Sequence, residues 1–198
     1  TGNHYRMTKT AALPRREANK AKIRSAILDA AVTKFGEKTI NSATMDEIAE
    51  EAKVSRATLF NYFPGKAEIV AGVVQQMDAF FVAQMDRFAQ YDVPLAQRVE
   101  DFFRAHARDL ETRWLRYRSL VGISEQGWGV DVGAPRFTRL NQAFLRLVHD
   151  APESDRLTLA EVLNGTYIGI VHSWHFESDY PLEDRLVAAA RLVMRSFQ

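Results

Sequence analysis

The sequence predicts an all-α protein. Its 198 residues contain successive runs in which apolar side chains recur every three or four positions, which is the period of an α-helix. Strict alternation of apolar and polar residues, which would indicate β-strands, is nearly absent. Proline and glycine separate the runs at intervals that suit helices. Apolar residues make up 46% of the chain, enough to bury a sizeable core.

Composition excludes several classes of protein. The sequence contains no cysteine, which rules out disulfides, thiolate metal sites and a cysteine nucleophile. No apolar run approaches the roughly 18 residues of a membrane span, and no signal peptide is recognised. We therefore expect a cytoplasmic protein without a membrane partner.

The net charge is small but unevenly distributed. Residues 1–66 contain 12 Lys/Arg and 7 Asp/Glu, a balance of +5, whereas residues 67–198 contain 14 and 18, a balance of −4. A basic N-terminal third on a mildly acidic remainder is typical of a protein that binds nucleic-acid phosphates at one end.

The first elements are a basic arm and an amphipathic helix. Residues 1–18 lack periodicity and are expected to be poorly ordered, either as a solvated tail or as an arm that reaches DNA. The spacing of apolar residues predicts a helix from about Asn19 to Gly36. Its apolar stripe contains Ile23, Ile27, Ala30, Ala31 and Phe35.

Residues 44–66 predict two short helices with a tight break. Thr44 is a suitable N-cap, and Glu47 can complete a capping box. The break falls at Lys53 and Val54, and Ser55 is a second N-cap. Pro64 and Gly65 end the second helix. Its predicted inward residues are Leu59, Phe60 and Phe63.

The opposite face of the second helix is short, polar and rich in hydrogen-bonding groups. It consists of Arg56, Ala57, Thr58, Asn61 and Tyr62. Such a face suits a DNA major groove better than it suits plain solvation.

This stretch resembles the N-terminal signature of the TetR family of transcriptional regulators. The matching positions are Thr44, Glu47, Ile48, Ala49, Ala52, Val54, Ser55, Thr58, Leu59, Tyr62, Phe63 and Lys66. The departures are Lys53 and Ala57 for glycines, Phe60 for tyrosine, and Ala67 for glutamate. At Lys53 the resemblance implies a positive φ, which costs a non-glycine residue about 1–2 kcal/mol.

The resemblance also implies DNA contacts. Thr44, Tyr62 and Lys66 would contact backbone phosphates, and Arg56, Thr58 and Asn61 would face the bases. The predicted DNA-binding residues are Thr44, Ser55, Arg56, Ala57, Thr58, Asn61, Tyr62 and Lys66. A three-helix DNA-binding domain with its arm would thus occupy residues 1–65.

Residues 66–198 predict a larger helical domain for effector binding and dimerisation. Apolar spacing predicts helices over about 66–91, 94–110, 114–121, 135–149, 155–177 and 181–197, with a glycine-rich loop over 122–135. Aromatic residues with polar tips favour a ligand pocket here, although core packing is the alternative for each one. The candidates are Met77, Phe81, Phe103, Trp114, Tyr117, Trp128, Tyr167, His172 and Trp174.

The last two predicted helices suggest a dimer interface. Gly165 and Gly169 would allow another helix to approach closely, and the resemblance implies a four-helix bundle between two subunits. The candidate interface residues are Val162, Gly165, Gly169, Ala189, Leu192 and Val193.

Catalytic and metal sites are not indicated. His172 and His175 share a face only loosely and have no third ligand at a convincing spacing. No catalytic serine elbow or glycine-rich phosphate loop is found. We expect no metal, no cofactor and no enzymatic activity.

The resulting expectation is a dimeric, ligand-responsive transcriptional regulator. It would repress by binding a palindromic operator and be released by a small, largely apolar effector, with activation left open. The alternatives are a DNA-binding protein without a ligand pocket and a helical enzyme with a DNA-binding-like head.

Overall fold

The computed structural model describes residues 15–112, 118 and 133–197, and within these ranges the chain forms α-helices and no strand. The all-α prediction is confirmed. The helices are α1 (Arg15–Glu37), α2 (Met45–Glu51), α3 (Arg56–Tyr62), α4 (Lys66–Phe88), α5 (Leu95–Thr112), α6 (Gly133–Leu147), α7 (Glu153–Phe176) and α8 (Leu182–Arg195). The predicted helix over 114–121 lies almost entirely outside the described residues, and so does most of the predicted loop over 122–135.

Helix α1 begins earlier than the sequence suggested. It starts at Arg15 instead of Asn19, so the expected lack of order is wrong for residues 15–18. Arginine, glutamate and alanine are all good helix formers, and Glu17 lies in the first turn, where a negative charge is favourable.

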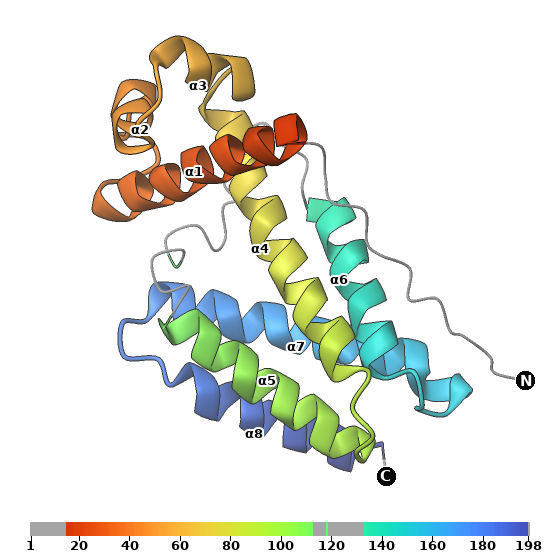
Figure 1. The fold of residues 1–198 in the computed structure, drawn as a ribbon. Helices are drawn as coiled ribbons and strands as arrows, with labels where there is room; N and C mark the ends of the chain where they lie inside the picture. Colours follow the sequence, from red (N-terminus) through yellow and green to blue (C-terminus); the bar gives the residue numbers. More distant parts are fainter. Residues whose placement is uncertain (1–14, 113–117, 119–132, 198) are drawn as a thin grey trace, which may run out of the picture.

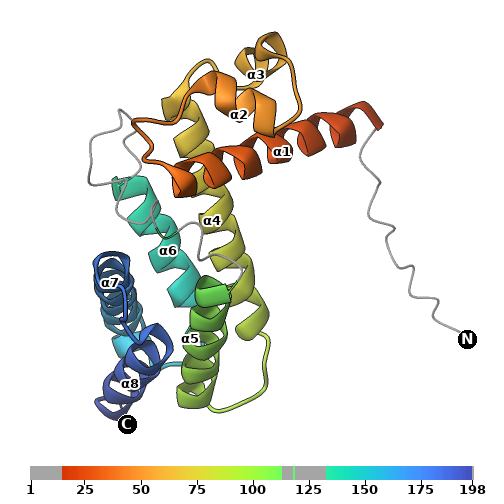
Figure 2. The same ribbon diagram turned by 90° about the vertical axis from the view of Figure 1, so that its left-hand side faces the viewer.

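The helices are arranged as a head and a body. Figure 1 shows α1, α2 and α3 together at one end, with α4 running from this head into the body formed by α5–α8. Figure 2 shows α7 and α8 side by side at the end far from the head. The long helix α4 is therefore the structural link between the two parts.

Buried apolar side chains hold the three helices of the head together. Ile27, Phe35, Ile48, Leu59 and Phe63 are all buried. The first turns of α4 complete this core with the side chains of Ile69, Val70 and Val73.

Gly72 marks the closest approach of α4 to the head. A Cβ atom at this position would lie 2.9 Å from Leu28 Cδ2 and 3.1 Å from Phe63 Cε1. Real Cβ atoms essentially never come as close as the first distance, so a larger residue here would force the Leu28 side chain to shift. A shift of α4 would consequently be felt directly by α1 and by the end of α3.

The break between α2 and α3 is a Schellman motif. The Lys53 amide donates to Glu50 O at 3.0 Å, and the Val54 amide donates to Ala49 O at 3.0 Å. Lys53 has a φ of 56°, so the positive φ implied by the resemblance is confirmed. The motif satisfies carbonyls at the end of α2 and orients α3.

The body core is dominated by aromatic rings. Phe81 on α4 meets Phe102 on α5 edge-to-face at 5.5 Å between ring centroids, and it meets Phe144 on α6 in the same manner at 5.9 Å. Phe103 stacks on Tyr167 of α7 at 6.4 Å. These contacts bind four helices around one apolar centre.

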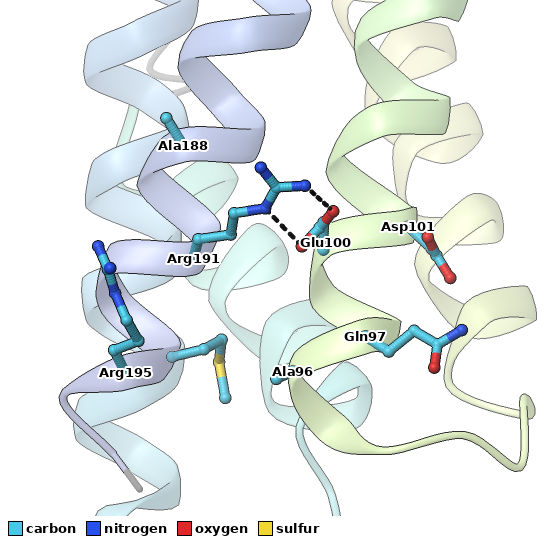
Figure 3. Close-up of a pocket in the computed structure, with 8 residues that line it drawn as sticks. Ala96, Gln97, Glu100, Asp101, Ala188, Arg191 and Arg195 are labelled. Carbon is cyan, nitrogen blue, oxygen red and sulfur yellow. Dashed lines mark hydrogen bonds and ion pairs between the residues drawn. The ribbon is translucent and has the colours of Figure 1, made fainter.

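An ion-pair network joins α5 to α8. Glu100 accepts from Arg191 Nε at 2.9 Å and from Arg191 Nη2 at 2.6 Å, and it also accepts from Arg104. Figure 3 shows Arg191 of α8 pointing toward Glu100 of α5. Both residues line a surface groove of about 680 Å³ between the two helices. Hydrogen bonds from Arg191 and then Arg104 lower the pKa of Glu100 to about 2.

We expect the contribution of Glu100 to the free energy of unfolding to depend on pH. Because the folded pKa of Glu100 is below its unfolded value of 4.5, its contribution is complete above that value and disappears as the pH falls through about 2. The Glu100→Gln variant should be less stable than wild type near neutral pH, with the difference vanishing at the acid end. Urea unfolding between these limits measures this effect. Glu50→Gln, an exposed change in the head, is the control. A difference that did not shrink with falling pH would contradict the assignment.

Candidate nucleic-acid interface and body cavity

Capping residues fix the start of each helix in the helix-turn-helix. The Thr44 side chain accepts from the Glu47 amide at 3.2 Å, and Glu47 Oε2 accepts from the Thr44 amide at 2.9 Å. The capping box predicted at Thr44 is therefore confirmed. Ser55 Oγ accepts from the Thr58 amide at 3.0 Å, as its predicted N-cap role requires.

The outer face of α3 presents most of the predicted base-facing set. Arg56, Ala57 and Asn61 are exposed, and Thr58 is half-buried. Arg56 Nη1 donates to Asp46 Oδ2 of α2 at 2.9 Å, with both side chains largely exposed. This surface pair holds the guanidinium over the outer face without burying it.

Phe60 corrects one prediction. It was expected inside, but it is 37% exposed, and the Arg56 guanidinium lies 5.5 Å from its ring centroid. Leu59 and Phe63 are four residues apart and share the inner stripe, whereas Phe60 shares the outer stripe with Arg56. A helix of seven residues buries only one narrow stripe. Phe60 therefore joins the face that a DNA groove would meet.

The predicted phosphate contacts differ in their surroundings. Thr44 is exposed and Tyr62 is half-buried. Lys66 Nζ donates to Ile40 O at 2.8 Å and to Asn41 O at 3.0 Å. These two hydrogen bonds use two of the three donors of the ammonium group. Lys66 therefore links α4 to the α1–α2 turn, a role that the sequence did not reveal.

The N-terminal end of α1 adjoins the C-terminal end of α3. Arg16, Asn19 and Lys20 line a shallow surface depression together with Tyr62. Arg16 was expected in the arm, whereas Asn19 and Lys20 were expected at the start of the first helix. The structure places all three on α1, beside the C-terminal end of α3.

A small central cavity lies among α4, α5, α6 and α7. Its volume is about 20 Å³, about enough for one water molecule and far below the roughly 300–1,000 Å³ of a drug-sized site. The described lining consists of Met77, Asp78, Phe80, Phe81, His106, Leu110, Leu140 and Tyr167. We call this the central cavity.

Three of the predicted ligand-binding residues, Met77, Phe81 and Tyr167, line the central cavity. Phe103 packs behind Tyr167 in the core. Trp174 is buried elsewhere, with the Arg118 guanidinium 5.1 Å from its ring, and His172 packs against Phe176. The other candidates, Trp114, Tyr117 and Trp128, lie outside the described residues.

Sequence reasoning missed the polar part of the central cavity. His106 lies on the apolar stripe of α5 between Phe102 and Leu110. This position in the sequence could have indicated that the histidine is buried. Asp78 lies three residues before Phe81 on α4, so the two side chains share a face. Its burial could not be predicted, because the arginine that pairs with it lies 61 residues further on.

His106 is held in a chain of hydrogen bonds. Its Nδ1 lies 2.6 Å from Gln84 Oε1, and its Nε2 lies 3.0 Å from the Tyr167 hydroxyl. Gln84 Nε2 donates to Asp109, which leaves Gln84 Oε1 to accept from His106 Nδ1–H. Burial lowers the pKa of His106 to about 3, so the imidazole is neutral at pH 7.

Asp78 brings a negative charge to the same cavity. Its side chain is 6% exposed, and its Oδ2 accepts from Arg139 Nη2 on α6 at 2.9 Å. The Arg139 side chain is 47% exposed and is not among the lining residues. The pair therefore links α4 to α6, with the arginine on the exposed side.

The predicted dimer residues form a partly apolar surface on α7 and α8. Val162 is 40% exposed and Leu192 is 61% exposed. Gly165 and Gly169 are exposed, and a Cβ at either position would meet nothing within 4 Å. Ala189 and Val193 are half-buried. We call these six residues, with Ile168 and Phe176, the α7–α8 face.

Two further features are absent from the described residues. No three His, Asp or Glu side chains of that part of the chain come close enough to hold a metal ion. Among the same residues, no helix is long and apolar enough to cross a membrane.

The chain is similar to known proteins in both sequence and fold. Residues 27–73 match the family model described as "Bacterial regulatory proteins, tetR family". The uncharacterised HTH-type transcriptional regulator YdeS of Bacillus subtilis (strain 168) is 36% identical over 100 residues, which cover 50% of this chain and 46% of YdeS. The match thus spans less than half the length of that relative.

Two solved structures share the fold over most of the chain. SmeT, the repressor of the Stenotrophomonas maltophilia multidrug efflux pump SmeDEF, superposes with a TM-score of 0.73 at 21% identity, covering 88% of this chain and 89% of SmeT. Thermus thermophilus FadR, a repressor in complex with lauroyl-CoA, gives a TM-score of 0.65 at 19% identity, covering 88% and 95%.

The two kinds of similarity agree with the geometry of the helix-turn-helix. Its caps, its Schellman turn and its exposed α3 face lie within the segment that matches the family model. The helix-turn-helix segment of this chain therefore matches the TetR family of bacterial regulatory proteins.

Proposed function

We propose that the protein is a dimeric transcriptional repressor that binds a palindromic operator and is released by a small effector. The observation that carries the proposal is the outer face of α3. Its arginine and asparagine side chains are exposed, and its N-terminus is fixed by the Ser55 cap. Such a helix can enter a major groove and bring hydrogen-bonding groups to base edges.

The proposed division of labour follows the head and the body. Residues 1–65 would bind DNA, and residues 66–198 would bind the effector and form the dimer. Helix α4 begins in the head core and ends against α5 and α6. It is therefore the element through which a change in the body would reach α3.

Dimerisation is supported by the α7–α8 face. Monomeric proteins rarely leave contiguous apolar surfaces exposed, and the open space at Gly165 and Gly169 would admit a second helix. A two-fold axis through this face would repeat the head once in each subunit, as a palindromic operator requires.

Repression and effector release are supported by the solved relatives. SmeT and the FadR of Thermus thermophilus are both described as repressors, and that FadR holds lauroyl-CoA. In this chain, the effector would bind at the central cavity. Its small volume also supports a second candidate, a DNA-binding regulator without an effector.

We expect Arg56→Ala to weaken binding to a DNA site selected by the full-length protein by about 1–3 kcal/mol and to relax preference at one base pair. The reason is that a bidentate arginine–guanine contact would be lost. Selection from random duplexes followed by fluorescence anisotropy measures both effects.

The matched control is Arg195→Ala, which removes an exposed arginine from α8, a helix of the body. It should leave both affinity and sequence preference unchanged. Equal behaviour of the two variants would refute the assignment of α3 as the base-reading helix. Failure of the wild-type protein to enrich any DNA sequence would refute the proposed function itself.

A further inference from the structure

We propose that Asp46 of α2 is a specificity-determining residue, which together with Arg56 of α3 recognises one guanine–cytosine base pair in the DNA major groove. The inference rests on the proposed function, because it assigns a further residue to the DNA-binding surface. It is carried by the hydrogen bond between the two side chains, the capped turns from which they project, and the aromatic ring beside the guanidinium.

Both side chains project from helix turns whose backbone is fixed. Asp46 lies in the first turn of α2, which the capping box between Thr44 and Glu47 closes. Arg56 directly follows Ser55, whose side chain caps α3. Capping hydrogen bonds satisfy the free amides of a first turn and hold its backbone in place. The separation of the two side chains is therefore set by the helix-turn-helix itself.

The Arg56 guanidinium has a neighbour on two sides. Its Nη1 donates to Asp46 Oδ2 at 2.9 Å, and its central carbon lies 5.5 Å from the ring centroid of Phe60, one helical turn further along α3. The Arg56 side chain is nevertheless 68% exposed, and that of Asp46 is 62% exposed. Carboxylate and ring thus restrict a side chain that would otherwise lose rotamer freedom on binding, and they leave it open to a groove.

The pair presents hydrogen-bond donors and an acceptor side by side. A guanidinium has five N–H donors, and the hydrogen bond to Asp46 uses one of them. The second hydrogen of Arg56 Nη1 and one hydrogen of its Nη2 remain for a bidentate contact. The carboxylate beside them has about four lone-pair sites, so it can accept a further hydrogen bond while it holds the arginine.

The major-groove edge of a guanine–cytosine pair has the complementary pattern. Guanine presents the acceptors N7 and O6, and cytosine presents its N4 amino donor beside O6. O6 and N4 are about 2.9 Å apart, because they share a hydrogen bond of the base pair. Arg56 Nη1 and Asp46 Oδ2 are separated by the same 2.9 Å. The guanidinium can therefore donate to N7 and O6 while the carboxylate accepts from N4.

A carboxylate on this surface serves selectivity and not affinity. The phosphates of DNA are negative, so an acidic side chain at the groove weakens binding that is independent of sequence. An adenine–thymine pair in the same orientation would place the N6 donor opposite the guanidinium and the O4 acceptor opposite Asp46. Like groups that face each other discriminate against the wrong partner. Asp46 thus adds an unfavourable contact with the wrong pair to the favourable contact with the right one.

The test uses the DNA site selected by the wild-type chain, at the guanine–cytosine pair for which Arg56→Ala loses its preference. Asp46→Ala should lower the preference for that pair over adenine–thymine by about tenfold in fluorescence anisotropy, because the carboxylate contact is lost and the guanidinium is less restrained. Binding to a duplex that lacks the site should be unchanged or slightly tighter, because a negative charge is removed. A merely structural role would weaken both kinds of binding.

Modified bases separate the two contacts. N4-methylcytosine in that pair lacks the N4 hydrogen that faces the groove, so it should weaken binding of the wild-type chain by about tenfold and binding of Asp46→Ala by no more than about twofold. 7-Deazaguanine lacks the N7 acceptor and should weaken binding of both proteins, since each retains Arg56.

The matched control is Glu50→Ala, which removes the same charge from an exposed position one turn further along α2. It should keep the base preference of the wild type and the same sensitivity to N4-methylcytosine. Circular dichroism and urea unfolding should show that both alanine variants retain the fold, because both positions are exposed.

Several results would overturn the inference. These are an unchanged base preference in Asp46→Ala, an equal effect of N4-methylcytosine on wild type and Asp46→Ala, or a preference lost in Arg56→Ala at a pair other than guanine–cytosine. In each case the wild-type chain still binds its selected DNA, so the proposed function stands. A wild-type chain that enriches no DNA sequence would end the proposed function and this inference together.

Discussion

Replacing Arg98 by alanine is expected to lower the free energy of unfolding by about 1–3 kcal/mol, because the change leaves acceptors of a partly buried network without their donor. The Arg98 side chain is 3% exposed. Its Nη1 donates to Asp150 Oδ1 at 2.9 Å and to Leu147 O at 3.1 Å, and its Nη2 donates to Asp150 Oδ2 at 2.6 Å and to Val93 O at 3.2 Å. One side chain thus joins the α4–α5 loop to the α6–α7 loop.

The loss should come from stranded partners as well as from the charge. Without the guanidinium, the carbonyls of Val93 and Leu147 lose a donor in a partly or fully buried setting. Arg98→Lys should recover only part of the stability, because an ammonium cannot reproduce the planar fork. Urea unfolding at neutral pH measures the three proteins.

Arg146→Ala is the control for Arg98→Ala. Arg146 pairs with Asp86 on the surface, where such pairs contribute about 0–1 kcal/mol. If Arg98→Ala lowered the free energy of unfolding no more than this control, the Arg98 hydrogen bonds would not stabilise the contact between the two loops.

Arg98 also illustrates what the sequence could not reveal. Its acceptors on Leu147 and Asp150 lie 49 and 52 residues away, and an arginine on an amphipathic helix is normally solvated. The caps at Thr44 and Ser55 and the turn at Lys53 were predictable, because each depends on neighbours within three or four residues. Local chemistry was readable, and pairing between distant helices was not.

The candidate sites divide in the same way. The outer face of α3 follows from spacing along seven residues, and the one error there, Phe60, arose from treating an adjacent residue as part of the inner stripe. In the body, aromatic content pointed to a cavity, but Asp78 and Arg139 come from different helices. The pairing of these two residues therefore emerged only from the structure.

Gly169→Leu is expected to convert the proposed dimer into a monomer and to weaken operator binding by about 100-fold or more. The physical reason is the loss of a close helix–helix approach at the α7–α8 face, where a leucine side chain would hold the second subunit away. Two linked heads bind two half-sites far more tightly than one head binds one, so loss of the dimer carries over to DNA.

The same substitution should not harm the subunit itself. A Cβ at Gly169 meets nothing within 4 Å, so the leucine can extend into open space. Glycine is the poorer helix former by about 1 kcal/mol, and the change should therefore stabilise α7 slightly. Circular dichroism and urea unfolding of the monomer check this, and they separate a blocked interface from a damaged fold.

Multi-angle light scattering gives the assembly state directly. The chain has a mass of 22.5 kDa, so the wild type should show about twice this mass at about 10 μM, and Gly169→Leu should show the single-chain value. Gln75→Leu, which adds a leucine at an exposed position on α4, controls for added surface hydrophobicity and should remain dimeric. An unchanged dimer in Gly169→Leu would place the interface elsewhere. A monomeric wild type would require each head to act alone, and a two-fold operator would then have no structural basis.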